Sequence, residues 1–242
     1  MSSPILATTQ IFTKYAQRNP FFYLLGVVLF PLSLLLPLSV LAGQSARVDI
    51  FIGSAICATT ITTIGDISDI ISYDRYSNAI SFFITRPVKP HQYILGIGAS
   101  TLFYNLAGMA VIFVAGSWLL DFQLSAARIA AVLVLIFLGW FNSCCVGFAI
   151  GMWGPRDHRA NANLAAVVGY ALTFLAPAYY PISVLPPGLQ ELSLTLYTTN
   201  LSLVGKSILR GEPLPGLCLV VLALYFVFNL VMLFKLARWR TR

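Results

Sequence analysis

The sequence predicts an all-α polytopic membrane protein, and two features of its composition lead to that prediction. Of the 242 residues, 58% are hydrophobic and only 10% are charged, whereas about a quarter of the residues in soluble globular domains are charged. The hydrophobic residues are also gathered into blocks of about 20, the length that a helix needs to cross the hydrocarbon core of a bilayer. A soluble domain is therefore excluded, and we expect residues 1–242 to form a single transmembrane domain.

Six apolar blocks are the predicted transmembrane helices. They cover residues 21–41, 50–71, 93–119, 129–153, 163–178 and 214–234. In the fourth block, Gly147 and Gly151 lie four residues apart, and this spacing of small residues lets two membrane helices approach closely. We therefore expect the fourth helix to pack tightly against a neighbour.

Two segments outside these blocks complete the expected architecture. Residues 1–19 have one apolar and one polar side and precede Pro20, which predicts an amphipathic elbow helix on the membrane surface. Residues 179–212 contain no clean spanning run and are interrupted by Pro181, Pro186 and other helix-breaking residues. We expect short re-entrant or interfacial helices there.

Residues 73–92 form the most polar interval between apolar blocks, and residues 74–85 predict a short amphipathic helix. Tyr76, Ile80, Phe83 and Ile84 recur on one face of that helix. The opposite face carries Asp74, Ser77, Asn78, Ser81 and Thr85, and Pro87 and Pro90 end the helix. Such a helix can lie on a membrane surface or dock onto a partner, and the pattern alone leaves both open.

The lysines and arginines predict the orientation in the membrane, because they concentrate in cytoplasmic loops. With six spans, both termini lie on one side. That side holds eleven basic residues, namely Lys14, Arg18, Arg75, Arg86, Lys89, Arg156, Arg159, Lys235, Arg238, Arg240 and Arg242. The other side holds only Arg47, Arg128, Lys206 and Arg210. We therefore expect a multi-pass protein of the cell (plasma or inner) membrane with both termini in the cytoplasm. The position of these basic residues in cytoplasmic loops explains the net charge of +7, so we expect no nucleic-acid binding.

Catalytic and metal-binding patterns are absent from the sequence. His91 and His158 lie in separate polar loops without a cysteine or serine motif beside them. The four cysteines, Cys57, Cys144, Cys145 and Cys218, lie inside apolar blocks without metal-ligand spacing, so we expect small buried thiols. The sequence Gly205-Lys206-Ser207 resembles the end of a phosphate-binding loop, but Asn200 replaces the required glycine. We therefore expect no catalytic residue, metal or cofactor in this chain.

A polar stripe in the second predicted span is a candidate transport path. It consists of Thr59, Thr62, Thr63, Asp66 and Asp69, which recur every three or four residues. Carboxylates inside a membrane are costly and usually face protein or water, so they are functional candidates. Solvation of Asp66 and Asp69 at the cytoplasmic end is the alternative. Asn105 and Asn142, in the third and fourth spans, predict hydrogen bonds between helices.

The region around residues 74–96 resembles the cytoplasmic coupling region of type-two ABC export permeases, the membrane subunits of drug, lipid and polysaccharide exporters. Asp74 stands where the family pattern begins with glutamate, and Arg75, Pro87 and Val88 match it outright. Ile80 and Phe83 match in apolar character, and Leu95-Gly96 follow in place, whereas Tyr76, Asn78, Ala79 and Ser81 depart from the commonest residues. Pro181 and Pro186 fit the outward motif of the same family, although its later proline is missing at residues 197–199.

The resemblance implies a homodimer, or a heterodimer with a similar subunit, driven by two copies of a separate ATPase that binds ATP and Mg. The ATPase would dock on the helix of residues 74–85, with Asp74, Arg75, Tyr76, Ile80, Phe83, Ile84 and Pro87 as the coupling residues. The loop of residues 154–159 is a second candidate contact.

Three functions remain open at this point. The leading one is export of an amphiphilic or lipid-like substrate, drugs included. A polysaccharide or lipid-linked glycan is the alternative cargo, favoured by Phe21, Phe22 and Tyr23 at the inner mouth. A third possibility, from another class, is an ion-coupled secondary carrier that uses Asp66 and Asp69, although no inverted repeat is visible.

Overall fold

The computed structural model describes residues 4–17, 28–41, 46–85, 88–119 and 125–236, and these residues contain helices but no β-strand. The α-helices are α1 (Pro4–Gln17), α3 (Phe30–Leu41), α4 (Arg47–Tyr76), α5 (Ala79–Ile84), α6 (Pro90–Leu119), α7 (Ala126–Trp153), α8 (His158–Phe174), α9 (Pro187–Thr195), α10 (Tyr197–Arg210) and α11 (Gly216–Val231). The described residues also contain a 3₁₀-helix, η3 (Ile182–Val184), and a π-helical turn, η4 (Met232–Leu236).

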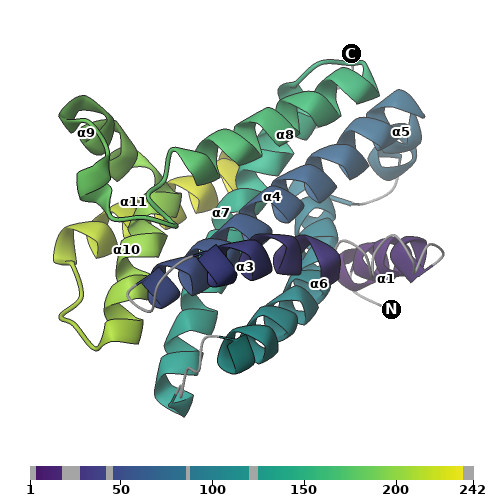
Figure 1. Cartoon of the computed structure of the whole chain (residues 1–242). Helices are drawn as coiled ribbons and strands as arrows, with labels where there is room; N and C mark the ends of the chain where they lie inside the picture. The colour runs from purple at the N-terminus through teal and green to yellow at the C-terminus, as the bar shows by residue number, and fades with distance from the viewer. Residues whose placement is uncertain (1–3, 18–27, 42–45, 86–87, 120–124, 237–242) are drawn as a thin grey trace.

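Helix α4 is the central element of the bundle. It packs against α7 and α8 most extensively, and also against α6, α10 and α3. In its most apolar 18-residue window 78% of the residues are buried, compared with 44% in α6, 56% in α7 and 28% in the last candidate span. In Figure 1, α4 runs from the end of the molecule that carries α10 to the opposite end that carries α5 and α1.

The close contact between α4 and α7 depends on the two glycines that the sequence singled out. A Cβ atom added to Gly147 would lie 2.9 Å from the Ile64 carbonyl oxygen, and one added to Gly151 would lie 2.8 Å from the Ile71 Cβ. Both separations are too short for a real side chain, so glycine is required at both positions. The predicted small-residue packing of the fourth span is thereby confirmed.

Four helical stretches among the described residues are long and apolar enough to cross a membrane. They are Arg47–Tyr76, Pro90–Trp118, Ala126–Trp153 and Gly216–Phe234, and they correspond to the predicted spans 50–71, 93–119, 129–153 and 214–234. The first predicted span is described only from residue 28 onward, where α3 forms. The fifth corresponds to α8, which has 17 residues. The count of six spans therefore stays a prediction.

Helix α1 packs on α6 by a close backbone approach. The Thr8 Cβ lies 2.5 Å from the position that a Cβ on Gly96 would take, so only glycine allows this contact. Phe12 adds an edge-to-face contact with Tyr93, at 6.1 Å between ring centroids. Leu6 and Ile11 remain exposed. The segment predicted as an elbow helix, residues 1–19, is thus helical over residues 4–17. The location of this helix on a membrane surface stays a prediction.

The prediction of one continuous helix over residues 74–85 is wrong. Helix α4 continues to Tyr76, and Asn78 then adopts a left-handed conformation, with φ 58° and ψ 15°, before α5 begins at Ala79. Asn is one of the few residues with a side chain that enters this conformation readily. The predicted segment thus consists of the end of one long helix and a separate short helix.

The segment predicted to be re-entrant, residues 179–212, contains η3 and two short helices, α9 and α10. Helix α10 ends at Gly211, which has a φ of 75° and closes the helix in the left-handed conformation that glycine favours. Its buried face packs on α4, α7 and α11. Helix α10 therefore belongs to the core of the bundle, whereas α9 projects from it (Figure 1).

Candidate functional site

The junction between α4 and α5 is held to the bundle by buried polar contacts. The Tyr93 hydroxyl of α6 donates a hydrogen bond to the Asp74 carboxylate at 2.5 Å, and both side chains are buried. The Arg75 guanidinium donates to the Gly151 carbonyl oxygen of α7 at 2.6 Å. The last turn of α4 is therefore tied to two neighbouring helices.

A second group of contacts ties the same end of α4 to α8. The Ser68 hydroxyl donates to the Asn161 side-chain oxygen at 2.6 Å, and the Asn161 amide donates to the Ile150 carbonyl oxygen at 3.0 Å. One turn further along α4, His158 lies between Ser72 and Asp69: its Nδ1 is 2.9 Å from the Ser72 hydroxyl and its Nε2 is 3.3 Å from the Asp69 carboxylate. The loop of residues 154–159 is thus fixed to α4.

The predicted coupling residues divide into a buried and an exposed set. Ile80 and Phe83, predicted to face a partner, are buried among the chain's own helices, where Phe83 lies 4.9 Å from the Tyr93 ring between centroids. Asp74, predicted on the polar face, is buried as well. Tyr73, Tyr76, Ser77 and Asn78 are exposed and form what we call the α4–α5 corner. Of the remaining coupling residues, Pro87 and the Ile84 side chain lie outside the described part of the structure.

The predicted transport stripe on α4 is divided among several environments. Thr59 and Thr63 are buried inside the bundle. Asn105 of α6 donates to the Thr63 hydroxyl at 3.1 Å and lies 3.2 Å from the Thr62 hydroxyl, which confirms the expected helix–helix bond. Asn142 makes the other predicted bond, to Asn229 of α11.

The exposure of the stripe increases toward Asp69, because Thr62 is half-buried whereas Thr59 and Thr63 are buried. Asp66 is half-buried, and Asp69 is exposed and paired with His158. The structure therefore places only part of the stripe in the interior, and a role in a transport path stays a prediction for all five residues.

An apolar groove lies between α3 and α6. It has a volume of about 430 Å³ and is lined by Leu32, Ala110, Val111, Val114, Ala115 and Trp118. All six lining side chains are apolar, and Trp118 and Val114 are among the most exposed large hydrophobic residues of the chain. A groove of this kind fits a hydrocarbon chain better than a sugar.

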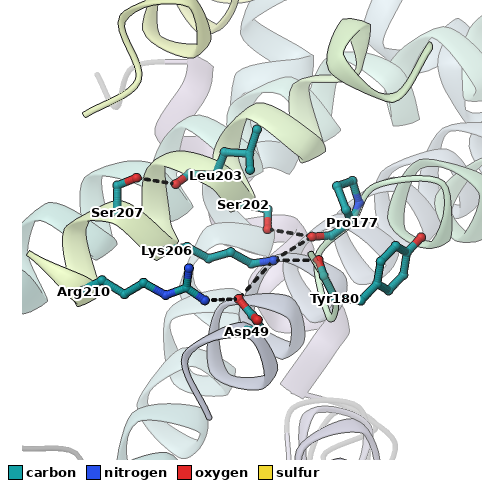
Figure 2. A network of polar contacts seen from close by, with 8 residues as sticks. All are labelled: Asp49, Pro177, Tyr180, Ser202, Leu203, Lys206, Ser207 and Arg210. Atoms are coloured by element: carbon teal, nitrogen blue, oxygen red, sulfur yellow. Dashed lines mark hydrogen bonds and ion pairs between the residues drawn. The ribbon is translucent and has the colours of Figure 1, made fainter. Parts of the chain in front are cut away.

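The opposite end of α4 carries a buried ionic network that the sequence analysis missed (Figure 2). The Asp49 carboxylate lies 3.2 Å from the Lys206 ammonium and 3.0 Å from the Arg210 guanidinium. Lys206 is only 6% exposed and also donates to the carbonyl oxygens of Pro177, at 2.7 Å, and Tyr180, at 3.1 Å. Burial lowers the pKa of the Lys206 ammonium, and the Asp49 carboxylate opposes that shift.

Sequence alone offered one signal for this network. Lys206 and Arg210 are four residues apart and so lie on one face of α10, but their partner Asp49 is more than 150 residues away. The motif residues Pro181 and Pro186 lie just beyond the turn that Lys206 holds, and both are exposed. Nothing in the structure tests their predicted role.

No group of three or more metal-ligating side chains occurs within the part of the chain that the structure describes. All four cysteines are buried free thiols, as predicted. The geometry is that of a helical membrane protein in which buried polar contacts tie both ends of α4 to neighbouring helices.

The comparisons with known proteins identify the family. Residues 5–204 match the family model described as the ABC-2 type transporter. Because this match covers most of the 242 residues, the chain belongs to the ABC-2 type transporter family, and the resemblance seen in the sequence is confirmed. A search of curated proteins gives no match. The protein is therefore the multi-pass membrane subunit, or permease, of an ABC transporter, and its family normally works with an ABC ATPase.

Proposed function

We propose that this chain is the permease half of an exporter that moves an amphiphilic or lipid-like substrate, drugs included, out of the cytoplasm or the inner leaflet. Two copies of a separate ATPase hydrolyse ATP with Mg, and a second, identical permease completes the transport path. Both termini and the α4–α5 corner face the cytoplasm of the cell (plasma or inner) membrane. Family membership supports the ATP-driven mechanism, and the distribution of eleven basic residues against four supports the orientation.

The proposed coupling role rests on one observation: hydrogen bonds tie the residues beside the α4–α5 corner to the rest of the bundle. Asp74 and Arg75 tie the corner to α6 and α7, and Ser68 and Ser72 tie the preceding turns to α8. A force applied at the corner is therefore passed to three helices at once and along α4. This is a rigid lever of the kind that converts domain closure in a partner into helix movement.

The docking surface we propose is the exposed α4–α5 corner rather than the apolar face of α5. Ile80 and Phe83 fill the chain's own core and are unavailable to a partner, whereas Tyr76 is 69% exposed. An exposed tyrosine beside short polar residues suits a protein interface, because its ring gives contact area and its hydroxyl gives a hydrogen bond. The buried residues Asp74, Arg75, Ile80 and Phe83 then support the corner from behind.

The groove between α3 and α6 favours an amphiphilic cargo. Its apolar lining has no group for the hydroxyls of a glycan. A glycan cargo remains the second candidate, and the aromatic residues that favoured it, Phe21, Phe22 and Tyr23, lie outside the described residues. The ion-coupled carrier is disfavoured, because the ABC-2 family normally works with an ABC ATPase.

Co-purification with the ATPase tests the proposed function. The tagged permease is co-expressed with the ATPase of the same transporter, purified in mild detergent and assayed for ATP hydrolysis, as wild type and as Tyr76→Arg. The matched control is Gln10→Arg, which introduces the same charge at an exposed position of α1, on the predicted cytoplasmic side. We expect the ATPase to co-purify with wild type and the control, and to be lost from Tyr76→Arg. Absence of the ATPase from wild type would overturn the proposed function, and its retention by Tyr76→Arg would overturn the proposed docking surface.

A further inference from the structure

The ionic network at the outer end of α4 fixes one turn of the chain on the surface of that helix. The turn comprises residues 177–180, which follow α8. Lys206 donates to the carbonyl oxygens of Pro177 and Tyr180, the two ends of the turn, and Ser202 donates to Pro177 as well. Because an ammonium group has three donors, the two carbonyl groups and Asp49 together use all of them.

The segment between these two anchored carbonyls lies directly against α4. A Cβ on Gly53 would be 2.6 Å from Cδ1 of the Tyr179 ring and 3.0 Å from the Ala178 carbonyl oxygen. Only glycine at this position of α4 lets the turn come so close. Tyr179 also lies beside the Cys57 thiol, one turn further along α4. The turn therefore covers Cys57, which is completely buried.

The turn lies on the face of α4 that carries Gly53 and Cys57. Thr59, the first residue of the predicted polar stripe, is two residues from Cys57 and therefore points about 200° away from it around the helix, so the turn does not cover the stripe. Any movement of the outer end of α4 against this turn must displace Tyr179 and the backbone around it. Displacement requires Lys206 to give up its two carbonyl partners.

We propose that Lys206 is a positioning residue for transport: anchored by Asp49, it holds the turn of residues 177–180 against α4 and so keeps the outer end of that helix fixed, with Cys57 covered, until the ATPase moves α4. We call Asp49, Lys206 and this turn the outer clasp. The proposal rests on the proposed function for its role in transport, whereas the clasp itself is a property of this chain alone. Removing Lys206 weakens the closed state and shifts the equilibrium between closed and open turns.

Arg210 provides a matched control within the same network. It binds the same oxygen of Asp49 as Lys206 does, but its side chain is 38% exposed and its guanidinium binds Asp49 rather than the carbonyl groups of the turn. Lys206→Met keeps the length of the apolar stem and removes the ammonium, and Arg210 still neutralises Asp49. Arg210→Gln removes an equal charge from the network and leaves the hold of Lys206 on the turn intact.

The rate at which Cys57 reacts with a maleimide measures how often the turn opens. The reporter chain carries Cys144→Ala, Cys145→Ala and Cys218→Ala, so that Cys57 is the one thiol left. In the purified permease without ATPase, we expect Lys206→Met to raise the labelling rate about tenfold, and Arg210→Gln to change it less than about twofold. An unchanged rate in Lys206→Met, or an equal rise in Arg210→Gln, would overturn the assignment to Lys206.

A second reporter separates opening of the clasp from general loosening. In that chain Cys144, on α7 among Gly98 and Trp140, is kept and the other three cysteines are alanine. Lys206→Met should leave its labelling unchanged. If Lys206→Met raised the labelling rates of Cys144 and Cys57 by the same factor, the variant would be partly unfolded, and the proposed clasp would be wrong.

The complex with the ATPase tests the role in transport. Addition of ATP and Mg should raise Cys57 labelling in wild type and produce no further rise in Lys206→Met, whose turn is already open. A complex that hydrolyses ATP without any change at Cys57 would overturn this role. Failure to form the complex would contradict the proposed function, whereas the labelling of the permease alone would still decide whether the clasp exists.

Discussion

At the scale of single residues, the polar side chains near the C-terminal end of α4 have definite partners. Asp74 is buried and accepts a hydrogen bond from Tyr93, and Asn161 is buried and contacts Ser68 and Ile150. A buried polar group that loses its partner costs about 1–3 kcal/mol. These residues therefore hold the end of α4 in one position, which is what a lever requires.

Tyr93→Phe tests the contribution of the Asp74 contact. The substitution keeps the ring that packs on Phe12 and Phe83 and removes the hydroxyl that donates to the buried carboxylate. We expect the free energy of unfolding in detergent to fall by about 1–3 kcal/mol. Tyr170→Phe, at an exposed tyrosine of α8, should change it by less than about 0.5 kcal/mol. Equal stability of the two variants would show that the Asp74 contact contributes nothing.

Some of these residue contacts were predictable from the sequence and others were not. Asn105 and Asn142 are isolated amides within apolar spans, and such groups must find a partner on a neighbouring helix; both do. Lys206 carried no such signal, because it lies on a semi-polar segment where a charge can be solvated. Its burial depends on α10 packing against α4, a tertiary contact that periodicity does not report.

At the scale of elements, the interface between α4 and α7 is the most extensive helix–helix contact among the described residues. Gly147 and Gly151 lie against Ile64, Ile67 and Ile71, so the two backbones approach more closely than side chains would allow. The sequence predicted this contact because the spacing of small residues is itself the physical cause of close packing.

Gly147→Ala tests this interface against a matched glycine. The new Cβ would meet the Ile64 carbonyl oxygen at 2.9 Å, so we expect a loss of about 1–3 kcal/mol in the free energy of unfolding. Gly65→Ala, on α4 with nothing within 4 Å of the added Cβ, should instead be neutral or stabilise by up to about 1 kcal/mol. Thermal unfolding in detergent measures both, and a stable Gly147→Ala variant would contradict the packing.

The break between α4 and α5 is the element that sequence reasoning predicted incorrectly. The apolar periodicity of Tyr76, Ile80 and Phe83 continues across Asn78, and periodicity alone gives no sign that the chain turns there. The left-handed conformation of Asn78 ends α4, and the burial of Ile80 and Phe83 in the core then fixes α5. A helix end of this kind depends on one backbone angle, which the hydrophobic pattern does not encode.

Asn78→Val tests the turn. A β-branched residue in the left-handed conformation costs about 1–2 kcal/mol, so we expect lower stability and weaker binding of the ATPase at the α4–α5 corner. Asn78→Gly adopts the same angles without strain, so it should retain the stability and bind the ATPase better than Asn78→Val does. The two variants are compared by thermal unfolding and by co-purification with the ATPase. Wild-type behaviour of Asn78→Val would mean that the turn is unnecessary.

At the scale of the whole molecule, α4 connects two functional ends. Its last turns carry the corner proposed to receive the ATPase, and its first turns carry the outer clasp. The helix has 30 residues, or about 45 Å at 1.5 Å per residue, so it spans a bilayer from one side to the other. A movement at one end is therefore transmitted to the other by a single rigid helix, provided that the two ends face opposite sides of the membrane.

The distribution of charge predicts the orientation in the membrane, and single cysteines test that prediction. In a chain with all four native cysteines changed to alanine, Gln10→Cys places a thiol on the exposed side of α1, and Ser183→Cys places one on η3. Because the basic residues predict that α1 is cytoplasmic, a membrane-impermeant maleimide added to intact cells should label Ser183→Cys and not Gln10→Cys. Gln10→Cys should be labelled only after the cells are permeabilised. If Gln10→Cys were labelled in intact cells and Ser183→Cys were not, the true topology would be the reverse of the predicted one. The α4–α5 corner would then be inaccessible to any ATPase in the cytoplasm.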